Sequence, residues 1–449
     1  MRVVTRLFIV VMIFAVCSMI SALGQVASVM HLPASSSHHV AKEQGFVGVN
    51  AAHHPVPTQG NYVVVNNDLG GVANSALVYK RLNRSLSLVS TLGSAGQGLG
   101  GGYFSIPRIS IGVTPLDHCI FVGDAGSSDI SAWWSTTPVG TYVANAGYLA
   151  NLYGLGLVYH SEPGMFGNIQ VNGYLYANFT ASGVIESFAV AAGDMNYMPC
   201  SLIDTGNGAT AIGINQGVAD GMTTRGNYLA AAYADGSVGM YELGGGAINL
   251  KSQKVATGFG VLGVTPTQVY ITQNEKYVVA DDLGGVASTW DVFPNANGLL
   301  AASTTYQPAG AGGGDAQIYG SNTFVASPDE TVLYIAGSYS GLLNGNSMII
   351  ATDAFNNATG AITATNCGVS TIPGYGTLWE YAGNTALVTN TGKGKGVWQA
   401  LAGFGVTNAS YVAASIADAN GCLTYSFTTT NNQSETAFSL QSYSGSPSQ

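Results

Sequence analysis

Short apolar runs, rich in β-branched and aromatic residues, recur along the chain and end within a few residues at Gly, Asp, Asn or Ser. This pattern is typical of buried β-strands that end in turns. The runs recur at intervals of 49 to 57 residues and begin at Tyr62, Cys119, Tyr174, Tyr228, Tyr277, Val332 and Ala386. A second short strand is predicted after each run, at 76–79, 129–133, 184–190, 237–243, 287–292, 347–352 and 396–400. No stretch after residue 30 sustains a helical period, so an all-β chain is predicted.

The hexapeptide DLGGVA occurs twice, at 68–73 and at 282–287, each time directly after one of these runs. The two copies lie 214 residues apart, which is close to four of the intervals above. Repeats of about 50 residues built from strands are typical of β-propeller blades. The sequence therefore predicts a seven-bladed β-propeller with four-stranded blades, whose ring is closed by a C-terminal strand at 422–427 or 436–443. A β-helix is the alternative, but its repeat is shorter.

Glycine-rich patches fall near residues 100, 155, 207, 260, 312 and 375, mostly ahead of the next apolar run. We expect the innermost strand of each blade to begin just after such a patch, because crowded inner strands favour residues without side chains. A phosphate-binding loop is the alternative, but it requires a helix behind the glycines and none is predicted.

The N-terminus predicts export. Arg2 and Arg6 precede an apolar run that ends at Ala22-Leu-Gly24, which indicates a signal peptide at 1–24. Residues 25–58 read as a flexible linker that holds five of the seven histidines, and 59–449 as the propeller. A retained membrane anchor, a lipidated Cys17 and a loosely held metal on the paired histidines are the alternatives for this region. We expect a secreted, periplasmic or envelope protein without a transmembrane span in the mature chain.

Charge excludes one class of partner. Loss of Arg2 and Arg6 leaves 11 Lys and Arg against 23 Asp and Glu, a net charge of −12. Such a chain lacks the basic surface that binds nucleic acid. We expect a monomer whose propeller face binds a small molecule, a glycan or an envelope protein. No residue spacing in the repeat region predicts a metal site, and no cofactor is expected.

Four cysteines remain in the mature chain, Cys119, Cys200, Cys367 and Cys422, and they allow three pairings. Cys119 lies inside an apolar run and is expected simply to be buried. Cys367 and Cys422 are one repeat apart, and equivalent positions of neighbouring blades are expected to be too far apart to bridge.

Candidate site residues come from the few charged side chains near predicted channel loops and turns. His160 and Glu162 would activate a water molecule while Arg108 stabilises an oxyanion, as in ester hydrolysis. The alternative is structural: Glu162 and Arg108 form an ion pair across blades, and His160 satisfies backbone groups. A candidate ligand-binding set consists of Asp124, Asp281, Asp282, Asp315 and Glu380.

The segment Ser327–Ala336, SPDETVLYIA, resembles the SPDG-x-x-hydrophobic-Tyr-Val segment of lactonase-like seven-bladed propellers. That superfamily contains YVTN-repeat proteins and bacterial 6-phosphogluconolactonases. The resemblance implies the propeller fold and, as one activity, lactone hydrolysis. A 6-phospho-sugar substrate requires a cationic pocket, for which this chain has too few clustered cations. The sequence thus favours an exported binding scaffold, with hydrolysis of uncharged lactones at the channel mouth as the alternative.

Overall fold

The computed structural model divides the chain into two compact units, Met1–Phe46 and Val47–Gln449, and every described residue belongs to the second. The predicted signal peptide and linker lie outside the described residues. Among the residues described, no helix has the length and apolar character needed to cross a membrane. The structure describes residues 61–66, 72–82, 85–98, 109–113, 118–124, 126–127, 129–135, 143–149, 155–179, 184–210, 219–233, 235–258, 265–283, 289–308, 318–327, 329–339, 347–365, 367, 370–371, 382–390, 398–406, 409–417, 423–430 and 439–444.

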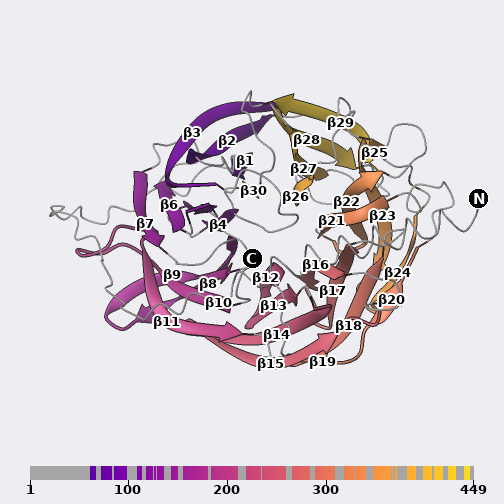
Figure 1. The fold of residues 1–449 in the computed structure, drawn as a ribbon, viewed down its shortest axis with the longest axis horizontal. Coiled ribbons are helices and arrows are strands. Elements are labelled where there is room, and N and C mark those ends of the chain that lie inside the picture. The colour runs from indigo at the N-terminus through magenta and orange to yellow at the C-terminus, as the bar shows by residue number, and fades with distance from the viewer. Residues whose placement is uncertain are drawn as a thin grey trace, which may run out of the picture. The chain divides into compact units, whose positions relative to one another are not determined.

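The described strands form seven antiparallel sheets, numbered here in chain order (Figure 1). Sheet 1 consists of β30 (Ser439–Ser444), β1 (Asn61–Asn66), β2 (Ala73–Leu82) and β3 (Ser85–Gln97). Sheet 2 consists of β4 (Ile109–Val113), β5 (His118–Asp124), β6 (Asp129–Ser135) and β7 (Val143–Leu149). Sheet 3 consists of β8 (Leu155–Phe166), β9 (Ile169–Phe179), β10 (Val184–Ala191) and β11 (Leu202–Thr210).

The remaining sheets repeat this order. Sheet 4 consists of β12 (Ala219–Arg225), β13 (Tyr228–Tyr233), β14 (Ser237–Gly244) and β15 (Ala247–Val255). Sheet 5 consists of β16 (Thr265–Ile271), β17 (Tyr277–Leu283), β18 (Trp290–Ala296), β19 (Leu299–Leu300) and β20 (Thr304–Tyr306). Sheet 6 consists of β21 (Ile318–Ala326), β22 (Val332–Tyr339), β23 (Ser347–Asn356), β24 (Ala361–Ala364) and β25 (Ser370–Thr371). Sheet 7 consists of β26 (Ala382–Asn390), β27 (Trp398–Val406), β28 (Ala409–Ala417) and β29 (Leu423–Thr430).

The series of sheets closes through the C-terminal strand. The inner strands β4, β8, β12, β16, β21 and β26 each lie beside the inner strands of the neighbouring sheets, and β30 lies between β26 and β4. β30 pairs with β1, so sheet 1 takes its inner strand from the other end of the chain (Figure 1). Of the two closing strands predicted from the sequence, 436–443 overlaps β30, whereas 422–427 lies in β29, the outer strand of sheet 7. The predicted all-β propeller fold is confirmed.

The apolar runs are the second strands of their sheets. Six of the seven predicted runs fall in β1, β5, β9, β13, β17 and β22. The run at Ala386 is also a strand, but it is the inner strand β26, and the second strand of sheet 7 is β27. β27 reads WQALAGFGV, where Gln399, Gly403 and Gly405 interrupt the apolar run.

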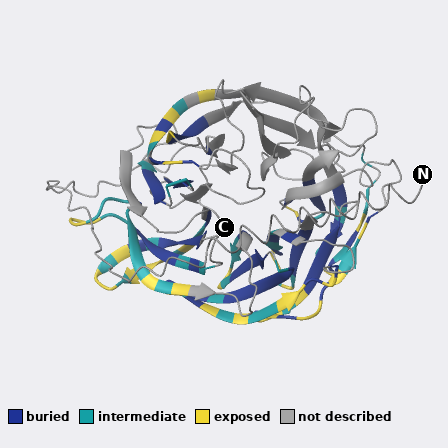
Figure 2. Ribbon diagram, in the orientation of Figure 1, coloured by how far each residue is buried: buried dark blue, intermediate teal, exposed yellow. Residues whose placement is uncertain are grey.

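The second strands β5, β9, β13, β17 and β22 read as apolar runs because both of their faces are buried between neighbouring sheets (Figure 2). In β9, Tyr174 and Tyr176 pack toward sheet 4, with Met222 and Leu229. Leu175 and Ala177 alternate with them and pack toward sheet 2. Successive strand residues point to opposite faces, so a strand covered on both sides needs apolar residues at every position. Similar apolar clusters fill the contacts between sheets 4 and 5 and between sheets 5 and 6.

One contact recurs in three successive seams, where a seam is the contact between two neighbouring sheets. A tyrosine of the second strand packs against a glycine in the hairpin that joins the third and fourth strands of the next sheet. A Cβ atom on that glycine would lie 2.7 to 2.9 Å from the tyrosine ring, and its φ of +75° to +84° is in the left-handed region. The pairs are Tyr174 with Gly246, Tyr228 with Gly298, and Tyr277 with Gly360.

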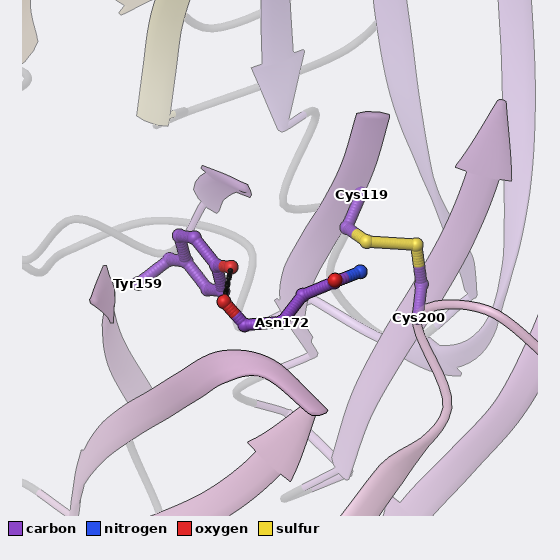
Figure 3. Close-up of a disulfide and its surroundings, with 4 residues drawn as sticks. All are labelled: Cys119, Tyr159, Asn172 and Cys200. Carbon is purple, nitrogen blue, oxygen red and sulfur yellow. Dashed lines mark hydrogen bonds between the residues drawn. A yellow bond between two sulfur atoms is a disulfide. The ribbon is translucent and has the colours of Figure 1, made fainter. Parts of the chain in front are cut away.

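A disulfide joins sheets 2 and 3 (Figure 3). Cys119 in β5 is bonded to Cys200, which ends the loop before β11; their Cα atoms are 5.5 Å apart. The prediction that Cys119 is simply buried was therefore incomplete. The loop is closed by Cys200 N–H, which donates to Ala191 O at 2.9 Å, and by Ala192 N–H, which donates to Gln170 O at 2.9 Å. Cys367 is also disulfide-bonded.

Replacing both Cys119 and Cys200 with alanine should lower the free energy of unfolding by about 3–5 kcal/mol, because the disulfide closes a loop over a sequence separation of 81 residues. Denaturant unfolding of the double variant against the oxidised wild type measures this loss. The double variant is preferable to chemical reduction, which would also cleave the disulfide of Cys367. Equal midpoints for the two proteins would show that this disulfide does not stabilise the contact between sheets 2 and 3.

Candidate functional site

The structure brings two of the predicted site residues together. His160 and Glu162 both lie in β8, the inner strand of sheet 3. Asp124 ends β5, and Asp281 and Asp282 lie in β17. Arg108, Asp315 and Glu380 lie outside the described residues. No interaction between His160 or Glu162 and Asp124 or Asp281 is found in the part of the chain that the structure describes.

His160 and Glu162 are inside the inner strand rather than in the loop before it. β8 begins at Leu155, so Glu162 is seven residues into the strand, roughly 20 Å from its start at about 3.3 Å per residue. The β8–β9 hairpin follows at residues 167 and 168. The pair therefore lies nearer to this hairpin than to the loop that the sequence analysis placed at the channel mouth.

His160 faces sheet 4 together with Glu162. Val158, two residues earlier, packs into the apolar cluster between sheets 3 and 4, and residues two apart on a strand share a face. The His160 side chain is half-buried, and its ring centroid is 6.5 Å from that of Tyr176. Burial lowers the pKa of His160, and the negative charge of Glu162 partly opposes this shift. The imidazole is thus held in its neutral, proton-accepting form near neutral pH.

Glu162 is tied to the next sheet. Its Oε1 accepts a hydrogen bond of 2.9 Å from the backbone N–H of Gly245, in the β14–β15 hairpin. The adjacent Gly246 is the glycine against which Tyr174 packs. Glu162 Oε2 and the hydroxyl of Tyr176 are buried and have no hydrogen-bond partner among the described residues. Burial and then the charge of Glu162 raise the pKa of both Tyr174 and Tyr176. The hydrogen bond from Gly245 to Glu162 therefore stabilises the adjacent contact between Tyr174 and Gly246.

Asp281 forms hydrogen bonds inside the protein, and Asp282 is placed by backbone pairing. Asp281 is fully buried, and its Oδ1 accepts the backbone N–H of Gln268 at 2.7 Å, at a point where the β16–β17 register shifts. Asn178, near the end of β9, accepts the backbone N–H of Gly156 in the same manner. Asp282 pairs with Pro266 in the β16–β17 ladder. These contacts hold inner strands on second strands.

A pair of carboxyl groups was missed by the sequence analysis. Asp124 and Asp129 face each other in the β5–β6 ladder, and both are buried. Burial, and next the charge of Asp124, raise the pKa of Asp129 to about 7. The sequence signal was the spacing in DAGSSD, since residues at both ends of a tight hairpin turn lie opposite each other. Within the described residues, no group of three or more His, Cys, Asp or Glu side chains is placed to hold a metal ion.

Comparison with known proteins adds the fold relationship. No protein-family model matches this chain, and no curated protein matches it. Among solved structures, a periplasmic gluconolactonase of Pseudomonas aeruginosa matches with a TM-score of 0.55 and 12% identity over 85% of this chain and 99% of that one. A candidate 6-phosphogluconolactonase from Bacteroides fragilis matches with a TM-score of 0.54 and 13% identity over 85% and 98% of the two chains. A Lactobacillus plantarum protein matches with a TM-score of 0.54 and 13% identity, over 85% of this chain and 99% of that one. The chain therefore has the fold of the lactonase-like β-propellers.

Proposed function

We propose that this protein is an exported, seven-bladed lactonase-like propeller that serves as a binding scaffold at the cell envelope or exterior, where it holds a small molecule, a glycan or an envelope protein. The observation that carries this proposal is the position of Glu162. The carboxylate of the predicted acid–base pair is bonded to the backbone of Gly245 and supports a contact between sheets. A group held in this way stabilises the architecture rather than relaying protons.

The disulfide supports export. Cys119 and Cys200 are both fully buried and bonded to each other. Disulfides persist in oxidising compartments and are rare where thiols are kept reduced. The predicted signal peptide at 1–24 accounts for transport to such a compartment.

Export should be visible at the N-terminus of the mature chain. Intact-mass and peptide analysis of protein from the producing cell should find a chain that begins near Gln25 and contains the Cys119–Cys200 disulfide. An intact Met1 in a cytosolic fraction would overturn the export proposal.

Hydrolysis of an uncharged lactone is the second candidate, and the neutral state of His160 favours it. His160 would accept a proton from water, the hydroxide would attack the lactone carbonyl, and cleavage of the ring C–O bond would leave a hydroxy acid once the alkoxide is protonated. Lowering of the pKa of His160 by burial suits such a base. The Pseudomonas protein of the same fold is described as a periplasmic gluconolactonase.

A panel of uncharged aldonolactones, their open-chain acids and short glycans distinguishes the two functions. The scaffold proposal expects a ligand that raises the melting temperature while a pH-stat detects no lactone opening above the buffer rate. Hydrolysis that His160→Ala abolishes at unchanged melting temperature would replace the scaffold with the hydrolase. Ser161→Ala is the matched control, because the exposed Ser161 is adjacent on β8 but points away from Glu162.

A further inference from the structure

The seam between sheets 1 and 2 is built around the carboxylate of Asp124. From sheet 1, Asn74 Nδ2 and Ser94 Oγ donate to Asp124 Oδ1 at 2.9 and 2.8 Å. From its own sheet, Ser131 Oγ donates to Asp124 Oδ2 at 2.7 Å. Asn74 also donates to Asn66 Oδ1 at 2.8 Å. The Asp124 carboxylate thus accepts three hydrogen bonds from neutral groups, two of them across the seam.

Asp129 lies directly opposite this carboxylate. Its side chain is 6% exposed, and its Oδ1 has no hydrogen-bond partner among the described residues. That oxygen lies against Gly96 of β3, where a Cβ atom would approach it to 1.9 Å. The turn between the two aspartates is itself bonded to sheet 1, because Gly126 N–H donates to Gln97 O at 2.9 Å and Gln97 N–H donates to Ser127 Oγ at 2.7 Å. Movement of Asp129 would therefore disturb contacts that join the sheets.

Among the described residues, no cation forms an ion pair with either carboxyl group. The described groups that face the pair from β1, β2, β3 and β6 are the neutral side chains of Asn66, Asn74, Ser94 and Ser131, with Gly96. The Ser127 hydroxyl of the turn hydrogen-bonds Asp129 and opposes the rise of its pKa in part. Among the described residues, Asp124 is the only ionisable group whose charge shifts the pKa of Asp129. Two buried carboxyl groups that face each other cannot both ionise without a large free-energy penalty.

We propose that one proton shared between Asp124 and Asp129 acts as a latch on the seam between sheets 1 and 2, and that loss of this proton as the pH rises loosens the sheet that closes the propeller. A proton fits this pair better than a metal ion. Three of the lone pairs of Asp124 already receive hydrogen-bond donors, and Gly96 occupies the space against Asp129 Oδ1.

The direction of the effect follows from the pKa of Asp129, which rises from 3.8 to about 7 through burial and then through Asp124. Between these two values the folded protein binds more protons than the unfolded chain, so stability falls as the pH rises. The stabilisation is complete near pH 4 and is lost once the pH passes about 7. The folding equilibrium constant should fall by roughly one order of magnitude between pH 5.5 and 7.5 from this group alone. His160 has the opposite tendency below its unfolded pKa, because burial lowers its pKa. A comparison of variants therefore isolates the latch.

Asp129→Asn tests the latch, since the amide keeps the volume of the side chain, cannot ionise and can donate to Asp124. Thermal and denaturant unfolding of the full mature protein should show that the wild type loses stability from pH 5.5 to 7.5. Over this range the folding equilibrium constant of Asp129→Asn should fall by a factor about ten times smaller than that of the wild type. Asp291→Asn is the matched control. Asp291 is a buried carboxylate at the seam of sheets 4 and 5 that accepts from Ser303, Thr305 and Gly258, and in this variant the backbone hydrogen exchange of 85–98 and 118–135 should keep the pH dependence of the wild type.

A local measurement protects the test against a variant that folds poorly. In the wild type, hydrogen exchange corrected for the intrinsic effect of pH should accelerate between pH 5.5 and 7.5 in peptides from 85–98 and 118–135 but not in those from 219–258. Equal pH dependence in the wild type and Asp129→Asn, or uniform exchange across all three regions, would overturn the proposal. Stabilisation of the wild type but not of Asp129→Asn by added Ca²⁺ at pH 7.5 would also overturn it, because the pair would then take a cation instead of a proton.

Discussion

The packing of a tyrosine ring against a glycine with a left-handed backbone conformation connects each sheet to the next from sheet 3 to sheet 6. Antiparallel pairing holds the strands of a sheet together, but it does not set how neighbouring sheets are aligned. At three successive seams that alignment comes from a second-strand tyrosine seated where the next hairpin has no side chain. The apolar clusters between sheets then supply most of the burial, at about 25 cal/mol for each Å² removed from water. The tyrosine contact selects the arrangement in which this burial is achieved.

Several of the described charged groups reinforce seams between sheets. Glu162 binds the hairpin that receives Tyr174, and Glu330 accepts hydrogen bonds from Tyr270 and Gln273 of the preceding sheet. Asp124 does the same between sheets 1 and 2. A chain with few charges that uses several of them in this way has fewer left for acid–base catalysis. This use of charge is the physical reason to prefer a binding scaffold over a hydrolase.

The sequence revealed the architecture but not the chemistry of the site. Strands covered on both faces leave a continuous apolar pattern, and this made the second strands and the propeller fold predictable. Sheet 7 differs, because the run at Ala386 lies in the inner strand β26, while Gln399, Gly403 and Gly405 interrupt the apolar sequence of the second strand β27. Long-range contacts left no periodic signal, so the Cys119–Cys200 pairing and the Glu162–Gly245 bond could not be derived. The site prediction treated scarce charges as free, whereas Glu162, Asp124 and Asp281 accept hydrogen bonds inside the fold.

The most direct test of the central role of the tyrosine–glycine contact is the free energy of unfolding of Gly246→Ala compared with Gly244→Ala. Both glycines lie at the β14–β15 hairpin, but a Cβ atom at Gly246 would lie 2.8 Å from the ring of Tyr174, whereas one at Gly244 would have nothing within 4 Å. Strain at positive φ and displacement of the ring should together cost about 2–4 kcal/mol in Gly246→Ala. Gly244→Ala should remain within about 0.5 kcal/mol of the wild type. Equal stability of the two variants would contradict this account.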